Sequence, residues 1–141
     1  MMLMPEAWEK MNGMDPALKD FYLYHACLNE PWDGPAAVVF NDGRFVGATL
    51  DRNGLRPARY TIYEDGLVVM GSEAGLVRLD ESKVVSKGRL GPGKIIAVDT
   101  EEGRFLDNDE VKQRVAGQQP YGEWCAQNMF VLGEHAQPQG A

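Results

Sequence analysis

Three arginines lie within one short stretch in the middle of the chain: Arg52, Arg56 and Arg59. A guanidinium group is always charged, and it presents a rigid fork of donors that matches the geometry of a carboxylate. One interpretation is that these side chains face an interdomain surface and pair with carboxylates of another domain. The other is that they are solvated or brace the local turn. The residue types alone leave both interpretations open.

The dipeptide Asn53-Gly54 stands between these arginines. Both residues tolerate positive φ, which the two central positions of a type I′ turn require, and Pro57 fixes the backbone just before the next strand-like run. Asp51 is suited to brace such a turn through backbone amides rather than to act as a base. The sequence therefore predicts a tight hairpin turn with positive φ at Gly54.

Glu73 is the acid whose surroundings most resemble a site, because it lies between Ser72 and Gly75 at an expected strand end. We interpret it as a capping residue at the N-terminus of a helical turn, which the helix dipole favours. Cys27 and Cys125 are far apart and show no Cys-x-x-Cys or metal-binding histidine pattern, so the sequence supports neither a metal site nor a disulfide. We therefore expect no metal-binding residue in this chain.

Helices are expected in four places. Asp15-Pro16 is a favourable helix start, and apolar residues then recur at helical spacing to about residue 28. Asp107 and Glu110 have the spacing of a capping box, which predicts a helix that Pro120 ends. The remaining two are a short helix over 5–12 and a last helix over 121–132.

Strand-like runs fill the segment between the first two long helices. The longer runs are 36–40, 44–50, 59–63 and 67–70, followed by shorter ones at 83–86, 94–98 and 103–106. The first two are apolar without alternation, which is typical of a sheet covered on both faces. With the turn at Asn53-Gly54, the middle of the chain is predicted to be a β-meander.

Composition limits the class of protein. A chain of 141 residues is one ordinary domain at most, and 14 Lys and Arg against 21 Asp and Glu give a net charge of −7. The sequence contains no basic stripe of the kind that neutralises phosphates, so no nucleic-acid partner is expected. It also contains no apolar run that approaches the ~20 residues of a membrane span, and we expect a cytoplasmic protein without a membrane partner.

Several motifs occur together in a specific order. Glu30-Pro-Trp-Asp-Gly-Pro-Ala36 precedes Asp51-Arg-Asn-Gly-Leu-Arg-Pro57, and Gly71-Ser-Glu-Ala-Gly75 and Lys87-Gly-Arg-Leu-Gly-Pro-Gly93 follow. This order resembles the class II, or N-terminal-nucleophile, glutamine amidotransferases, and within them the glutamate synthase group. The resemblance implies an α+β fold with antiparallel sheets and flanking helices, part of a four-layer αββα architecture. It assigns 1–132 to the C-terminal portion of the amidotransferase domain and 133–141 to a polar tail or linker.

The same resemblance bears on catalysis. In that family the nucleophile is an N-terminal cysteine whose own α-amino group acts as the base, and an upstream Asn-Gly pair holds the oxyanion. Residue 1 here is methionine, and Asn53-Gly54 is followed by Leu-Arg-Pro, which is typical of the later turn rather than of the oxyanion loop. The resemblance therefore implies a structural turn at Asn53-Gly54 and no catalytic or substrate-binding residue in this chain. We expect the isolated chain to lack glutaminase activity.

For the parent enzyme, the resemblance implies release of ammonia from glutamine and its use to convert 2-oxoglutarate to glutamate. FMN and an iron–sulfur cluster would be held by domains outside this sequence, and the partners would be the rest of the amidotransferase domain and the synthase domains. Two alternatives stay open: an autonomous non-catalytic scaffold or interaction module, and the same segment of a phosphoribosyl amidotransferase or asparagine synthetase type of enzyme. Self-association of the chain is also expected, because an uncovered apolar sheet face favours it.

Overall fold

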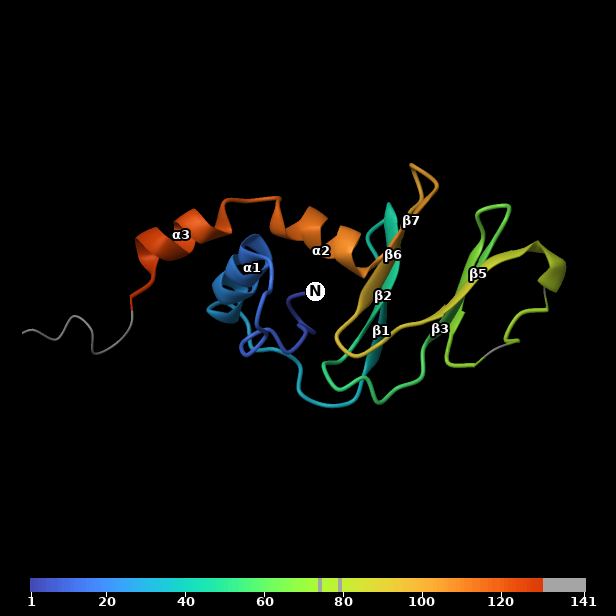
Figure 1. Ribbon diagram of the computed structural model, residues 1–141, viewed down its shortest axis with the longest axis horizontal. Helices are drawn as coiled ribbons and strands as arrows, with labels where there is room; N and C mark the ends of the chain where they lie inside the picture. Colours follow the sequence, from blue (N-terminus) through green and yellow to red (C-terminus); the bar gives the residue numbers. More distant parts are fainter. Residues whose placement is uncertain (74, 79, 131–141) are drawn as a thin grey trace, which may run out of the picture.

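The computed structural model describes residues 1–73, 75–78 and 80–130. Over these residues the elements form three layers that follow one another across Figure 1: a group of helices, a four-stranded sheet and a three-stranded sheet. Every strand pair in the two sheets is antiparallel. The structure therefore confirms the expected α+β class with antiparallel sheets and flanking helices.

The strands divide into two sheets. The first has the order β1-β2-β6-β7 and consists of Ala37–Asn41, Phe45–Leu50, Ile95–Asp99 and Arg104–Leu106. The second has the order β4-β3-β5 and consists of Val68–Gly71, Arg59–Tyr63 and Val84–Arg89, with the 3-10 turn η1 at Glu81–Lys83 before β5. We refer to them as the first and the second sheet.

The predicted β-meander is wrong, because β2 and β3 belong to different sheets. Residues 51–58 carry the chain from the end of β2 to the second sheet, and the amide of Leu90 donates to the carbonyl of Ala58 there (2.9 Å). Tyr60 of β3 then stacks on Phe105 of β7 across the gap between the sheets (5.4 Å between ring centres). The segment with the Asn-Gly turn is therefore a connection between layers and not the loop of a hairpin.

The helices α1 (Pro16–Ala26), α2 (Asn108–Ala116) and α3 (Tyr121–Asn128) lie on the far side of the first sheet from the second. Asp15 caps α1, and the predicted capping box of Asp107 and Glu110 begins α2. Two helix ends differ from expectation. Helix α2 ends at Ala116, four residues before Pro120. Helix α3 ends at Asn128, because the backbone of Met129 is extended. Residues 131–141, which include the expected tail, lie outside the described residues.

The predicted short helix over 5–12 is also wrong. The segment forms isolated turns, with the amide of Trp8 donating to the carbonyl of Glu6 and that of Met11 donating to the carbonyl of Trp8. The side chain of Glu6 is instead drawn into a buried ion pair with α2, described below. Tertiary contacts therefore override the weak local helix preference of this segment.

Buried side chains fill both spaces between the layers. Leu50 and Ile96 of the first sheet pack with Ala58 and Leu90 between the two sheets. The opposite face of the first sheet meets the helices through residues that include Ile95, Ala97, Leu106 and Val111. A third cluster joins the helices to one another through Phe21, Tyr22, Ala116 and Tyr121.

The two sheets do not cover each other fully at β1. Val39 is 68% exposed and Val46 is 41% exposed, although both lie on the face of the first sheet that points toward the second. They line an apolar cavity of about 200 Å³ between the sheets, together with Val68, Met70 and Phe105. The expectation that both faces of β1 and β2 are covered is therefore met on the helix side and only partly on the other.

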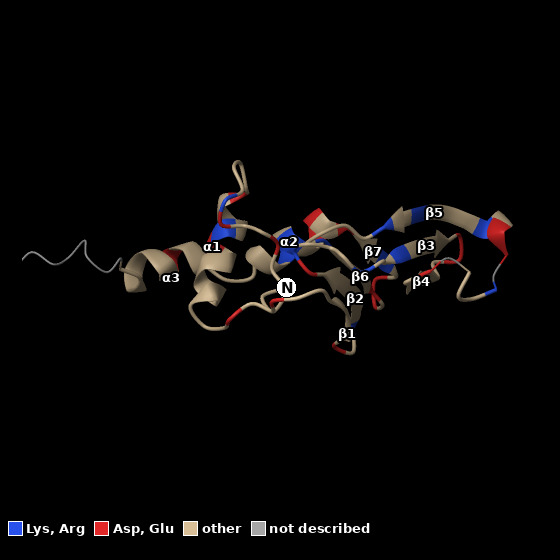
Figure 2. Ribbon diagram, turned by 90° about the horizontal axis from the view of Figure 1, so that it is seen from below, with Lys and Arg blue, Asp and Glu red and all other residues tan. Residues whose placement is uncertain are grey.

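Charged residues are distributed unevenly over the layers. Lys and Arg follow β3 and β5 of the second sheet in Figure 2, where Arg59, Lys87 and Arg89 lie.

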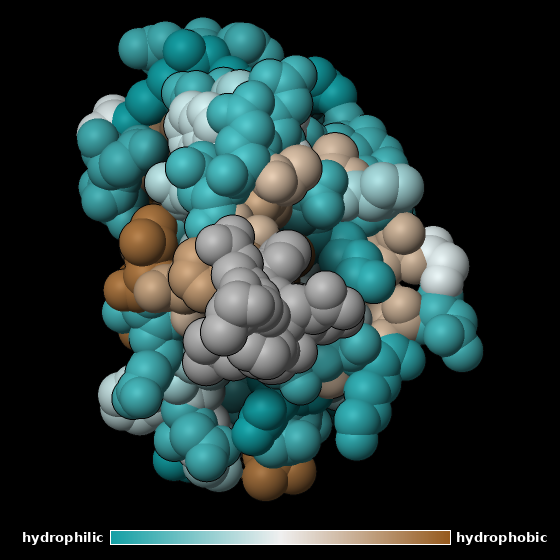
Figure 3. All heavy atoms as spheres, turned by 90° about the vertical axis from the view of Figure 1, so that its left-hand side faces the viewer, coloured by the Kyte–Doolittle hydropathy of each residue, from teal (hydrophilic) through white to brown (hydrophobic). Residues whose placement is uncertain are grey.

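The surface at the helix end of the molecule is mostly hydrophilic and carries separate, small hydrophobic patches (Figure 3). Within the described residues, no helix is long and apolar enough to cross a membrane.

We predict that Val39→Lys weakens self-association of the chain, because it places a charge in the open apolar cavity between the sheets. Light scattering over a concentration series measures the effect. Val85→Lys is the matched control, since Val85 is 67% exposed on β5 and does not line this cavity. A chain that stays monomeric at every concentration would show that this face is not a site of self-association.

Candidate functional site

Asp51 organises the turn that follows β2. Its carboxylate accepts hydrogen bonds from the amides of Ala36 (3.1 Å), Asn53 (2.9 Å) and Gly54 (3.2 Å), and only 3% of the residue is exposed. Burial by itself raises the pKa of Asp51, but these three amides outweigh it and hold the pKa below its usual value. Asp51 is therefore an ionised acceptor with its oxygens occupied and is not arranged as a base.

The turn is not of type I′. Gly54 has φ +61°, as predicted, but Asn53 has negative φ, since every residue with positive φ among those described is a glycine. The amide of Gly54 donates to the carbonyl of Asp51 (3.0 Å), so the turn spans 51–54 with Arg52 and Asn53 at its centre. The Asp51 carboxylate stabilises this conformation. The dipeptide Asn-Gly alone does not indicate this contribution from the preceding residues.

The turn rests on the loop before β6. A Cβ atom added to Gly54 would lie 2.7 Å from the Cα atom of Pro92, and the amide of Gly93 donates to the carbonyl of Asp51 (2.9 Å). The carbonyl of Gly93 in turn accepts a hydrogen bond from Lys112 Nζ of α2 (3.3 Å). A continuous set of contacts therefore joins the turn to the helix layer.

Lys112 and Glu6 form a buried ion pair, which the sequence analysis missed. Lys112 Nζ lies 2.5 Å from Glu6 Oε1, the two side chains are 5% and 10% exposed, and Tyr22 Oη donates to the same oxygen (3.1 Å). Burial lowers the pKa of Lys112, and burial together with the Glu6 carboxylate raises the pKa of Tyr22. No local pattern indicates a pair whose members lie at opposite ends of the chain.

The three arginines around the turn point to different places. Arg52 pairs with Asp33 (3.3 Å) and lines a cavity with Trp8 and Trp32. Arg59 lies on β3 and lines a cavity on the second sheet. Arg56 is exposed, and neither it nor Arg59 forms an ion pair within the described part of the chain. The structure does not gather the three guanidinium groups into one site.

Glu73 is exposed and follows β4 in a bend, and the described residues 72, 73 and 75–77 form bends and a turn rather than the helical turn expected at Glu73. Glu73 lines the same cavity of about 130 Å³ as Arg59. A Cβ atom at Gly71, the last residue of β4, would overlap Leu76 Cδ1, so the side chain of Leu76 lies over the end of this strand.

Neither cysteine is arranged as a nucleophile. Cys27 is exposed at the end of α1, where its thiol donates to the carbonyl of Leu23 (3.5 Å). Cys125 is buried in α3 with its Sγ atom 3.9 Å from the carbonyl of Asp20, and burial raises its pKa. A thiol is a nucleophile only as the thiolate, which a raised pKa disfavours.

Asp99 is a second buried carboxylate that the sequence analysis missed. It is fully buried, and Arg44 donates to it through Nε (2.9 Å) and Nη2 (2.6 Å), while Arg114 Nη1 lies 3.6 Å away. The hydrogen bonds from Arg44 lower the pKa of Asp99 to about 2. Both guanidinium groups also lie over the ring of Phe45, at 5.1 and 4.8 Å.

The pKa of Asp99 predicts a dependence of stability on pH. Because the folded pKa of about 2 is below the unfolded value of 3.8, this carboxylate stabilises the fold above pH 4 and the contribution is lost as the pH falls through 2. The difference in free energy of unfolding between the natural chain and Asp99→Asn should therefore shrink over that range in denaturant melts. Glu123→Gln, at an exposed carboxylate, is the control and should show no such trend. A constant difference for Asp99→Asn would contradict the assignment.

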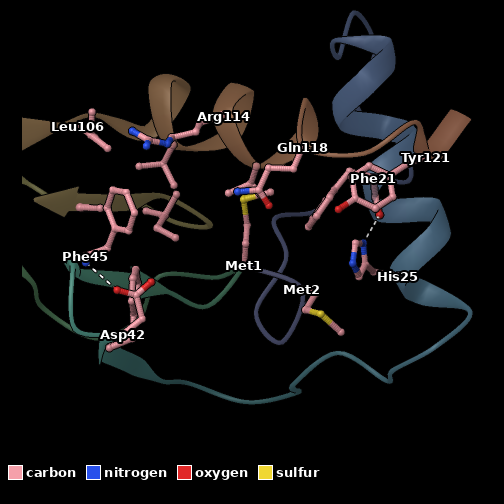
Figure 4. A pocket seen from close by; sticks show the side chains of 15 residues that line it. Met1, Met2, Phe21, His25, Asp42, Phe45, Leu106, Arg114, Gln118 and Tyr121 are labelled. Atoms are coloured by element: carbon pink, nitrogen blue, oxygen red, sulfur yellow. Dashed lines mark hydrogen bonds between the residues drawn. The ribbon is translucent and has the colours of Figure 1, made fainter. Parts of the chain in front are cut away.

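A cavity of about 370 Å³ lies between the helices and the first sheet (Figure 4). Most of its lining is apolar, with Phe45 and Tyr121 at its two sides, and His25 and Arg114 are among its polar groups. The Nδ1 atom of His25 is 2.8 Å from the carbonyl of Phe21, one helical turn earlier, and its ring packs 4.1 Å from that of Phe21. His25 is thus a boundary histidine held by its own helix.

No group of three or more His, Cys, Asp or Glu side chains that could hold a metal ion occurs among the described residues. The polar side chains that the fold brings together are instead paired with one another. Asp51 holds a turn, Lys112 and Glu6 join the helix layer to the loop beneath that turn, and Asp99 holds two arginines. Each of these clusters stabilises architecture, and none combines a nucleophile with a base.

Comparison with known proteins gives the family. The sequence profile of the class II glutamine amidotransferases matches residues 1–124. The chain therefore belongs to the class II glutamine amidotransferases. The α+β fold with antiparallel sheets and flanking helices is consistent with the N-terminal-nucleophile fold of that class.

Three similar proteins are all glutamate synthases. The chain is 54% identical over 126 residues to ferredoxin-dependent glutamate synthase 2 of Synechocystis sp.. The matched region covers 88% of this chain and 8% of that protein. It is 52% identical over 126 residues to ferredoxin-dependent glutamate synthase of Antithamnion sp., with the same coverage. It is 45% identical over 132 residues to the glutamate synthase [NADPH] large chain of Bacillus subtilis, covering 94% of this chain and 9% of that protein. The chain thus spans less than a tenth of the length of the curated relatives it matches.

Proposed function

We propose that this chain forms a structural part of the amidotransferase domain of a glutamate synthase. The observation that carries the proposal is the combination of a family match over residues 1–124 with two thiols that each donate to a backbone carbonyl. In such an enzyme these residues supply sheet, helices and a fixed turn. The nucleophilic cysteine and the oxyanion loop come from other residues of the domain.

The parent reaction that we propose releases ammonia from glutamine and uses it to convert 2-oxoglutarate to glutamate. The synthase domains and the rest of the amidotransferase domain are the partners of this chain, and we assign FMN and an iron–sulfur cluster to those other domains. The glutamate synthases of Antithamnion sp., Synechocystis sp. and Bacillus subtilis are 45–54% identical to this chain, which supports this choice over other class II enzymes.

We predict that the isolated chain does not release glutamate from glutamine. The reason is chemical, because amide hydrolysis by this class requires a thiol with an adjacent base, and here one thiol is buried with a raised pKa and the other donates to a backbone carbonyl. Glutamate release by the purified chain measures this directly. Turnover above buffer that disappears in Cys27→Ser or Cys125→Ser would refute the proposal that the chain supplies no nucleophile.

A further inference from the structure

A cavity of about 450 Å³ lies beside the Asp51 turn and is lined by two tryptophans. We call it the tryptophan cavity and define it by Trp8, Trp32, Arg52 and Asn53, which line it together with Pro5 and Pro31. Its volume is that of a typical ligand site, and its lining combines apolar and aromatic residues with the charged residues Glu6, Glu9, Lys10 and Arg52. Part of its inner wall is Glu6, which pairs with Lys112.

The aromatic walls are held in place. Trp8 stacks on Tyr22 of α1 with 5.8 Å between ring centres. The amide of Trp32 donates to the carbonyl of Leu3 (2.7 Å), while the residue remains 54% exposed. Grooves lined by aromatic residues recognise extended polypeptide, in particular proline-rich segments, which lose little conformational entropy on binding.

Arg52 gives the cavity a charge that a ligand can use. Its one ion pair within the described residues joins it to Asp33 at 3.3 Å, with the side chains 52% and 85% exposed. Exposed pairs of this kind contribute little to stability, so a ligand carboxylate can replace Asp33 at little cost. A carboxylate that binds both arms of the guanidinium fork makes a stronger contact than Asp33 does.

Two acids, Glu6 and Glu9, also line the cavity. The carboxylate of Glu6 already accepts hydrogen bonds from Lys112 and Tyr22 on the inner side. Glu9 is exposed and has Lys10 as its neighbour in the lining.

Leu55 and Arg56 follow the turn directly, and both are exposed, with Leu55 at 69%. Trp and Arg are the residue types that dominate binding energy at protein interfaces.

The turn that presents Arg52 is rigid. The Asp51 carboxylate accepts hydrogen bonds from the amides of Asn53 and Gly54, the two residues after Arg52, and Pro92 packs against Gly54. A side chain on a fixed turn has less conformational freedom to lose on binding than one on a free loop. This favours recognition of a defined ligand over a general attraction to anions.

We propose that the tryptophan cavity binds an extended polypeptide segment that carries an Asp or Glu side chain next to proline or another apolar residue. The carboxylate binds Arg52, and the apolar side chain lies between Trp8 and Trp32. The site goes beyond the proposed function, which assigns no ligand to this chain. It does not depend on glutaminase or synthase activity.

The probe is a library of random linear peptides displayed on phage and selected against the complete 141-residue chain. Enriched peptides are then synthesised and titrated against the chain by tryptophan fluorescence. We expect enriched sequences to share an Asp or Glu beside proline or an apolar residue. We expect Arg52→Glu to weaken their binding by about tenfold or more, because it removes a charge-assisted contact and adds a repulsive one.

Two further variants complete the test. Trp32→Ala should also weaken binding, and its exposed side chain can be removed with little effect on the core. Lys19→Glu is the control for the change of net charge, since Lys19 is exposed on α1 and does not line the cavity, and it should bind as the natural chain does. Enriched peptides without a carboxylate, equal binding by Arg52→Glu, or no enrichment at all would each overturn the proposal.

Discussion

Lys112→Met is expected to lower the free energy of unfolding by about 3–5 kcal/mol, because it leaves the Glu6 carboxylate buried without its cation. Lys112 also loses its hydrogen bond to the carbonyl of Gly93, so the loop beneath the Asp51 turn loses a contact as well. Burial keeps both side chains from compensating with water, since they are 5% and 10% exposed. Denaturant unfolding followed by circular dichroism measures the change.

The double variant Glu6→Gln/Lys112→Met separates the buried charge from the packing. Glutamine keeps an acceptor for Tyr22 and removes the charge, so the double variant should be more stable than Lys112→Met alone. Lys19→Met, at an exposed position on α1, is the control and should change stability by less than about 0.5 kcal/mol. A Lys112→Met chain as stable as this control would show that the ion pair does not hold the fold.

Gly54→Val is expected to destabilise the chain by at least about 2 kcal/mol, from two additive causes. A β-branched residue at φ +61° is strained, and its Cβ atom would lie 2.7 Å from the backbone of Pro92. Thermal or denaturant melts give the value.

Gly66→Val is the matched comparison for that variant. Gly66 has φ +83° in the turn between β3 and β4, but a Cβ atom there would meet nothing within 4 Å. It should therefore show the backbone strain alone, and the difference between the two variants should report the contact with Pro92. Equal losses would mean that the turn does not rest on the loop before β6.

Local signals predicted much of the secondary structure. The proline after Asp15 and the capping box of Asp107 and Glu110 place the starts of α1 and α2 correctly, because capping depends on residues close in sequence. The hairpin of β3 and β4 follows from its short polar turn for the same reason. Positive φ at Gly54 was also predictable, since glycine adopts it without steric cost.

Contacts between distant segments were not predictable in this way. The separation of β2 from β3 depends on which strands find partners, and β6 and β5, later in the chain, provide them. Glu6 pairs with a lysine of α2, and this contact replaces the short helix that the local pattern favours. The tryptophan cavity likewise requires that segments around Trp8, Trp32 and Arg52 meet, which no single window of sequence contains.

The most direct test of the proposed function is an exchange of segments. In the experiment, this chain is inserted in place of the matching segment of the glutamate synthase [NADPH] large chain of Bacillus subtilis, to which it is 45% identical over 132 residues. We expect a folded chimera that forms glutamate with glutamine as the nitrogen donor, and the same activity when Cys27 and Cys125 are both replaced by serine. A folded chimera that cannot use glutamine, or one that loses that activity with the two serines, would contradict it.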